Sequence, residues 1–78
     1  MKVTIRNIDK TIFDGQANEI VLPGLHGKVG IKPNHAAMSV ILTVGDIYVK
    51  LTGQINKFTI SEGIAHISNN MVSVLLTD

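Results

Sequence analysis

Cysteine and tryptophan are absent from this sequence of 78 residues, and aromatic side chains make up only 4% of it. Without cysteine the chain can form neither a disulfide nor a thiolate metal site, and nothing in it indicates an oxidising compartment. A chain this short buries only about 60% of the surface of its unfolded state, so its core is small. We therefore expect one domain over residues 1–78, stabilised by packing alone.

Long apolar runs and blocks of like charge are also absent. Nowhere do about 18 apolar residues follow one another, and the N-terminal residues lack the apolar run of a signal peptide. Seven Lys and Arg residues are balanced by six Asp and Glu residues and are scattered along the chain. No basic patch therefore exists to neutralise several phosphates. We expect a soluble protein that is not secreted, is not inserted in a membrane and does not bind nucleic acid.

The sequence does contain a series of short segments in which apolar and polar residues alternate. In residues 2–8, Val3 and Ile5 alternate with Thr4 and Arg6, which is the period of a strand buried on one face. Similar patterns predict further strands at residues 11–13, 17–22, 29–31, 35–42, 47–51, 55–60, 64–68 and 71–76. Strands that recur about every 8 to 12 residues are typical of an all-β sandwich or barrel.

Dipeptides rich in Gly, Asn and Asp predict hairpin turns between these segments. They are Asp14-Gly15, Thr52-Gly53 and Asn69-Asn70. Residues 8–11 predict a further turn, and Pro23 is expected to end the strand at residues 17–22. Asn34 could cap a helix over residues 35–42. The β-branched residues in that segment favour a strand instead, because they are stiff at χ1.

The densest group of Gly and Pro residues lies between the two halves of the chain. It comprises Pro23, Gly24, Gly27, Gly30 and Pro33. Gly accepts positive φ and Pro fixes φ, so these residues predict a loop with several turns in which at least one Gly needs positive φ. An ordinary hairpin needs only one or two such residues. The excess favours a binding loop that exposes Leu25, His26 and Lys28.

Catalytic and metal-binding patterns are weak in this sequence. His26, His35 and His66 lie in separate loops or strands without the spacing of metal ligands. No Ser, His and acid arrangement suggests a triad, and the Gly-rich loop lacks the Gly-Lys-Ser/Thr motif of a P-loop. We therefore expect a binding module with no catalytic residues, metal, cofactor or small-molecule substrate. The alternative is a lipoyl or biotinyl carrier domain, although Lys10 lies nearer the N-terminus than the modified lysine of such domains.

A longer pattern runs through the Gly and Pro residues. Residues 22–36 read Leu-Pro-Gly-x-x-Gly-x-x-Gly-Ile-x-Pro-x-His-Ala. Together with Phe13-Asp14-Gly15, residues 58–63 and residues 72–75, this pattern resembles the N-terminal domain of the epsilon subunit of F-type ATP synthases over nearly the whole chain. The chain departs from the family at Asn34, Ala37, Lys28 and Glu62. Lys28 stands where an acidic residue is frequent.

The resemblance implies a flattened β-sandwich of about ten short, mostly antiparallel strands. It also implies a non-catalytic rotor subunit of a proton-translocating ATP synthase, which links the gamma subunit to the membrane c-ring and supports coupling. By the same resemblance the c-ring side consists of Leu25, His26, Lys28 and Val29, and the gamma side consists of Asn7, His35 and Val40.

The resemblance further implies a location peripheral to the membrane, on the cytoplasmic face of the inner or plasma membrane or the equivalent side of an organelle. The family ordinarily continues into a two-helix C-terminal hairpin that inhibits ATP hydrolysis. We expect this chain to lack that hairpin, either as a naturally short subunit or as a fragment, and therefore to confer no such inhibition.

Overall fold

Nine β-strands make up most of residues 1–77, the part of the chain that this computed structural model describes, and no helix occurs there. The strands are β1 (Lys2–Arg6), β2 (Thr11–Gln16), β3 (Glu19–Gly24), β4 (Gly27–Ile31), β5 (Met38–Leu42), β6 (Gly45–Leu51), β7 (Gln54–Ile60), β8 (Gly63–Ser68) and β9 (Met71–Leu76). The predicted all-β class is confirmed, with nine strands in place of about ten.

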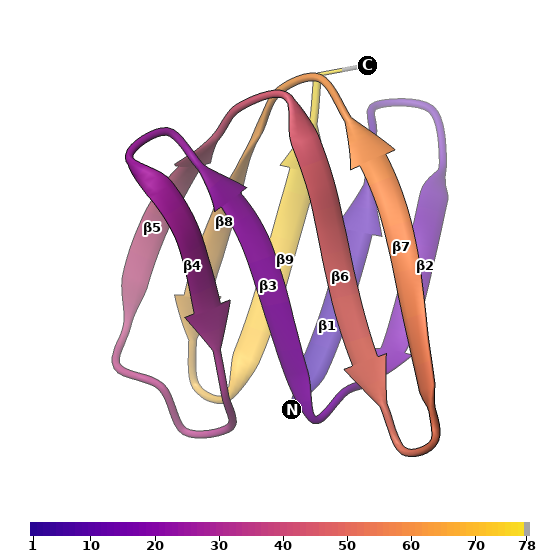
Figure 1. The fold of residues 1–78 in the computed structure, drawn as a ribbon, viewed down its shortest axis with the longest axis vertical. Coiled ribbons are helices and arrows are strands. Elements are labelled where there is room, and N and C mark those ends of the chain that lie inside the picture. The colour runs from indigo at the N-terminus through magenta and orange to yellow at the C-terminus, as the bar shows by residue number, and fades with distance from the viewer. Residues whose placement is uncertain (78) are drawn as a thin grey trace.

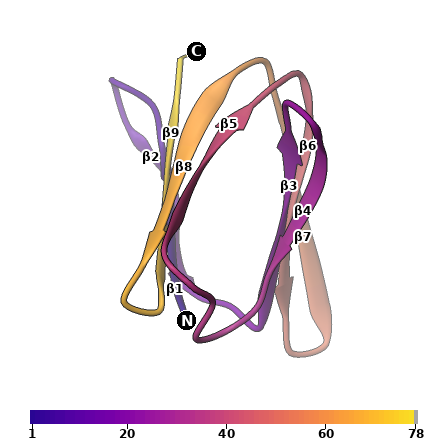
Figure 2. The ribbon, with the colours of Figure 1, turned by 90° about the vertical axis from the view of Figure 1, so that its left-hand side faces the viewer.

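The strands form one hydrogen-bonded sheet in the order β2-β1-β9-β8-β5-β3-β6-β7, and β4 pairs with β3. β5 joins β3 through the residue pair Gly24 and Leu42, where the sheet passes from one layer to the other. Figures 1 and 2 show the two layers, with β2, β1, β9, β8 and β5 in one and β4, β3, β6 and β7 in the other. All strand pairs are antiparallel except β1 with β9. This arrangement is the flattened, mostly antiparallel sandwich that was predicted.

The core lies between the two layers and is apolar throughout. It contains 16 buried hydrophobic residues, and no polar or charged residue of the described chain is buried with them. Ile20, Leu22 and Ile47 are among the fully buried side chains. Because the strands alternate, their polar residues face water on the outside of each layer, and burial of apolar surface is the main force that holds the layers together.

Two aromatic rings close the side of the sandwich where the outermost strands, β2 and β7, meet. The ring centroids of Phe13 and Phe58 are 5.8 Å apart, and the ring planes are inclined by 62°. This edge-to-face geometry is favourable for an aromatic pair. Both side chains are only half-buried, so they cover the edge of the core.

The hairpin predicted at Asp14-Gly15 is wrong. β2 runs through this dipeptide and pairs Asp14 with Thr4 and Gly15 with Val3 of β1. The Asp14 carboxylate also lies 3.2 Å from the Nζ atom of Lys2 across the strand pair. The local turn signal is overridden because the β1–β2 turn has already formed before Thr11, so the dipeptide falls in the middle of the returning strand.

The prediction that Pro23 ends its strand is also wrong. β3 extends to Gly24 and pairs Pro23 with Lys28 of β4. Proline has no N–H to donate, but the Pro23 carbonyl accepts a hydrogen bond of 2.9 Å from the Thr43 backbone N–H. Proline is tolerated here because the strand loses only one donor close to its end.

Other boundaries agree better with the sequence. The segment at residues 35–42 is a strand and not a helix, as predicted, but β5 begins only at Met38. The hairpins at Thr52-Gly53 and Asn69-Asn70 are confirmed. Gly53, Asn69 and Asn70 all have positive φ, at 73°, 52° and 58° respectively, as turns between antiparallel strands require.

Candidate functional site

The stretch rich in Gly and Pro folds as a hairpin followed by a loop. β3 and β4 are joined by the two-residue turn Leu25-His26, and Gly24 lies opposite Gly27 where the hairpin closes. Gly27 has a φ of +124°, a conformation that side-chain-bearing residues rarely adopt. Gly24 serves a different purpose, because a Cβ atom there would lie 2.6 Å from the Gly27 carbonyl oxygen. The two glycines thus allow the strands to meet closely at this turn.

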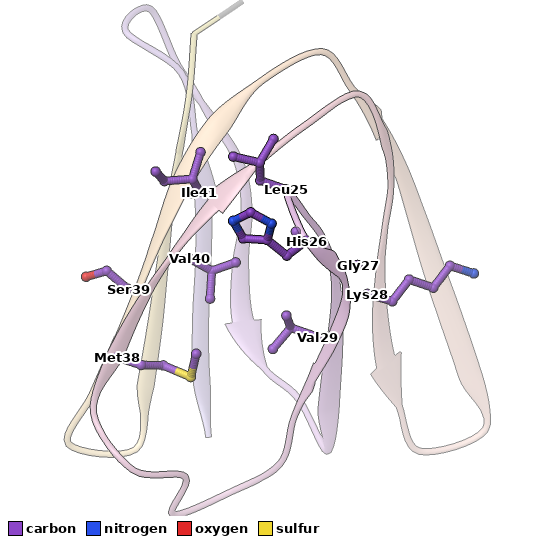
Figure 3. Close-up of a pocket in the computed structure, with 10 residues that line it drawn as sticks. Leu25, His26, Gly27, Lys28, Val29, Met38, Ser39, Val40 and Ile41 are labelled. Carbon is purple, nitrogen blue, oxygen red and sulfur yellow. The ribbon is translucent and has the colours of Figure 1, made fainter.

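Beside this turn a cleft of about 350 Å³ opens between β4 and β5. β4 pairs with β3 alone. β5 pairs with β8 along its whole length and with β3 only at Leu42, so within residues 1–77 no strand covers the cleft. Figure 3 shows the side chains of Val29, Met38 and Val40 directed into it. The floor of the cleft is therefore apolar.

The rim of the cleft combines apolar and polar groups. Leu25 and Ile41 stand at one end with 56% and 60% of their surface exposed. The two are held together by a backbone hydrogen bond of 2.9 Å from the Leu25 N–H to the Ile41 carbonyl. The imidazole of His26 lies across the mouth of the cleft between the two strands (Figure 3). Exposed apolar side chains around an apolar hollow are typical of a binding surface.

The cleft gathers most of the residues that the resemblance selects. Its lining includes all four residues assigned to the c-ring side, and also Val40, which was assigned to the gamma side. Lys28 differs from the other lining residues, because its side chain points away from the cleft (Figure 3). There Lys28 borders a second hollow that is also lined by Asp46 and Tyr48.

Asn7 and His35 lie outside the cleft lining and in separate places. Asn7 belongs to the β1–β2 turn. That turn lies on the side of the sandwich away from β4 and β5 (Figure 1). Its Oδ1 atom accepts hydrogen bonds of 2.9 Å from the backbone N–H groups of Asp9 and Lys10. His35 is in the loop after β4, with Nδ1 2.8 Å from the Ala36 carbonyl oxygen. The three residues assigned to the gamma side therefore form no single patch.

Asn70 holds the loop at residues 32–37 in place, a role that the sequence did not predict. The Asn34 backbone N–H donates a hydrogen bond of 2.8 Å to Oδ1 of Asn70, in the β8–β9 turn. Asn34 itself has a φ of 64°, so it turns the chain and caps no helix. Asn70 thus shapes its own hairpin and also holds a loop 36 residues away, which no local pattern could show.

The contribution of this hydrogen bond to stability can be measured by comparing variants of two neighbouring asparagines. Asn70→Gly and Asn69→Gly both place Gly at a position of positive φ, where it is accommodated without strain. Only Asn70→Gly also removes the acceptor for Asn34. We expect Asn70→Gly to have a free energy of unfolding about 1 kcal/mol lower than Asn69→Gly, as measured by urea denaturation. Equal values for the two variants would show that the hydrogen bond does not stabilise the fold.

A second polar contact lies on the outer face of the layer that contains β5 and β8. Oγ of Ser39 and Nδ1 of His66 are 3.0 Å apart, on residues that pair across the two strands. No hydrogen bond joins His66 to a carboxylate within residues 1–77, and no group of three potential metal ligands occurs in that range. This contact therefore lacks the third group of a catalytic triad.

Two solved structures share this fold. A chain in the cryo-EM structure of the Euglena gracilis mitochondrial ATP synthase superposes with a TM-score of 0.90 at 22% identity, covering 97% of this chain and 49% of that one. A chain in the structure of the Tetrahymena thermophila mitochondrial ATP synthase central stalk and c-ring superposes with a TM-score of 0.81 at 20% identity, covering 99% of this chain and 63% of that one. Across residues 1–77 we find no helix with the length and apolar character needed to cross a membrane.

The sequence also matches named relatives. It is 35% identical over 78 residues to the chloroplastic ATP synthase epsilon chain of Phaeodactylum tricornutum, covering 100% of this chain and 59% of the relative. The chain spans little more than half the length of the curated relatives it matches. A model of the family described as "ATP synthase, Delta/Epsilon chain, beta-sandwich domain" matches residues 1–78. The chain therefore belongs to the family of ATP synthase delta/epsilon β-sandwich domains.

Proposed function

We propose that this chain is a non-catalytic rotor subunit in the central stalk of a proton-translocating ATP synthase, where it links the gamma subunit to the c-ring and supports coupling. The observation that carries the proposal is the family match over residues 1–78, which also supports treating them as one domain. The Tetrahymena neighbour belongs to a structure of the central stalk and c-ring. We propose the gamma subunit and the c-ring as the partners of this chain.

The fold suits a part that transmits force. Hydrogen bonds run through one sheet from β2 to β7, so a load applied at the β3–β4 turn is shared by both layers without passing through a flexible linker. Protein interiors are packed as densely as organic crystals and have low compressibility. We propose that the sandwich acts as a stiff spacer between two partners.

The proposed contacts with the c-ring are Leu25, His26, Lys28 and Val29, and those with gamma are Asn7, His35 and Val40. Val40 differs from the others because only 7% of its surface is exposed. It can therefore touch only a partner that enters the cleft. In this proposal the chain is peripheral to the membrane, on the cytoplasmic face of the inner or plasma membrane or the equivalent organelle side.

The proposal is tested by binding to the purified gamma subunit and c-ring of the same organism. We expect the chain to bind both partners in a pull-down and to restore coupled ATP synthesis in a complex depleted of its epsilon subunit. Intact-mass measurement of the natively isolated chain is the control for the carrier-domain alternative, in which a lysine such as Lys10 carries a lipoyl or biotinyl group. Binding to neither partner, or a modified lysine, would contradict the proposed function.

A further inference from the structure

We propose that two copies of this chain associate in solution through the outer face of β5, β8 and β9. This association is separate from the rotor role, because it concerns the isolated chain and commits to a second copy as the occupant of the face. The two copies are related by a two-fold axis that runs along β9.

The outward side chains of β5, β8 and β9 form rows that cross the three strands, which lie side by side in one layer (Figure 2). Strand register places Ile41 beside Ile64 and Ile64 beside Leu75. These three residues form the apolar row, and 60%, 48% and 47% of their surfaces are exposed. A contiguous row of exposed apolar side chains is typical of an interaction surface.

The three strands that carry the apolar row contain no Asp, Glu, Lys or Arg, whereas each of the other six described strands contains at least one. His66 is the one ionisable residue in these three strands. Burying their outer face therefore leaves no carboxylate, ammonium or guanidinium group without water. A partner that brought a charge to the apolar row would lose the hydration of that charge without compensation. The occupant is therefore uncharged over the contact, as a second copy is.

The shape of the surface also fits a second copy. An apolar hollow of about 530 Å³ lies over the apolar row, and Ile8 of the β1–β2 turn stands at its wall. Ile8 has 90% of its surface exposed, so it projects from the domain. One surface thus carries both a projecting isoleucine and a hollow that can receive one. A two-fold interface requires this kind of self-complementarity.

An axis along β9 also brings opposite charges together. Arg6 of β1 pairs with Leu75 on one side of β9, and Glu62 immediately precedes β8 on the other side. Both residues are exposed, and neither forms an ion pair within residues 1–77. Rotation by 180° about the axis exchanges the two sides, so Arg6 of each copy faces Glu62 of the other. The same rotation places Ile8 of each copy over the hollow of the other.

Net charge permits this association, and the size of the face limits its strength. The formal net charge of the chain is +1, and a net charge near zero favours association. A standard interface takes about 800 Å² from each partner. Three strands spaced about 4.8 Å apart span only part of one side of the domain, so the contact falls short of that area. The dimer should therefore form only at high protein concentration.

The first test compares two exposed isoleucines by sedimentation equilibrium. The mass of the wild type should rise from 8.4 kDa toward twice that value as the protein concentration approaches about 1 mM. Ile64→Lys places a charge in the apolar row. Because a two-fold contact contains the substitution twice, this variant should associate at least about a hundredfold more weakly.

Ile55→Lys is the matched control for Ile64→Lys. Ile55 is 61% exposed and lies on β7, in the other layer. This variant should associate within about twofold of the wild type, because its substitution lies outside the contact. Circular dichroism confirms that both variants are folded.

The second test exchanges the charges across the axis. Arg6→Glu alone and Glu62→Arg alone each set like charges against each other, so each variant should associate several-fold more weakly than the wild type. In an equimolar mixture, one chain is acidic at both positions and the other is basic at both. The mixed dimer regains both contacts, so the mass should rise again. A mixture that associates as weakly as its components would overturn the two-fold arrangement along β9.

The outcomes separate this association from the proposed function. A wild type that stays monomeric at about 1 mM overturns the inference, and so does a dimer that is lost with Ile55→Lys but kept with Ile64→Lys. If the wild type is monomeric and Ile64→Lys weakens the pull-down of gamma, gamma covers the face, and the rotor role stands without the dimer. A wild type that dimerises through Ile64 but binds neither gamma nor the c-ring supports the inference and contradicts the proposed function.

Discussion

Replacing Ile47 by Ala should lower the free energy of unfolding by about 2 to 5 kcal/mol. Ile47 is fully buried in the middle of β6, and it pairs across the strands with Phe58 of β7. Removing most of its side chain loses apolar burial and leaves a cavity that neighbouring β-strands, held by their hydrogen bonds, can close only in part. A domain of this size has a total stability of about 4 to 12 kcal/mol. Ile47→Ala should therefore remove a large part of it.

Ile55 in the neighbouring strand provides the matched control. It is the same residue type, but 61% of its surface is exposed. Ile55→Ala should change the free energy of unfolding by about 0.5 kcal/mol or less. Urea denaturation followed by circular dichroism measures both variants. Similar losses in the two would mean that Ile47 does not lie in a close-packed core.

Replacing Gly24 by Val should both destabilise the domain and abolish the binding to the c-ring that we propose. The new Cβ atom would meet the Gly27 carbonyl oxygen at 2.6 Å, and it would also crowd the side chains of Val29 and Val40 at 3.3 and 3.4 Å. Overpacking of this kind costs about 1 to 3 kcal/mol and forces the backbone to shift. The shift moves the β3–β4 turn and the floor of the cleft together, so binding should fall even where the variant remains folded.

Gly15 in β2 offers the comparison. A Cβ atom there would meet only the ring of Phe13, at 3.4 and 3.7 Å, and β-branched residues favour strands. Gly15→Val should keep c-ring binding and should change the free energy of unfolding by about 0.5 kcal/mol or less. Equal binding by Gly24→Val and Gly15→Val would show that the close approach at the turn is not needed for function.

The strands of the second half were predictable because each has a clear period and a turn with its own signal. β9 was predicted at residues 71–76 and is found there, between the Asn69-Asn70 turn and the end of the chain. In the first half of the chain, local turn signals and the actual strand boundaries disagree. Asp14-Gly15 looks like a hairpin in isolation, but the chain has already turned through the hydrogen bonds to the Asn7 side chain.

The site could be predicted only where its residues are neighbours in the sequence. Leu25, His26 and Val29 stand close together in the chain, and the Gly and Pro pattern around them marked the segment. Met38 and Ile41 come from β5, which meets the β3–β4 turn only because the sheet crosses between layers at Leu42. That crossing is a tertiary feature. Periodicity shows which face of a strand is buried but not which strands meet.

The parallel pairing of β1 with β9 sets when the domain can fold during its synthesis. Of the nine described strands β1 is synthesised first, and one of its two sheet neighbours, β9, is synthesised last. Until residues 71–76 have left the ribosome, Val3 and Ile5 belong to an isolated hairpin with β2, which is marginally stable in water. Closing a contact over so many residues also makes folding slow. The nascent chain thus exposes β1 until β9 emerges from the ribosome, and the nine-stranded sheet cannot close before then.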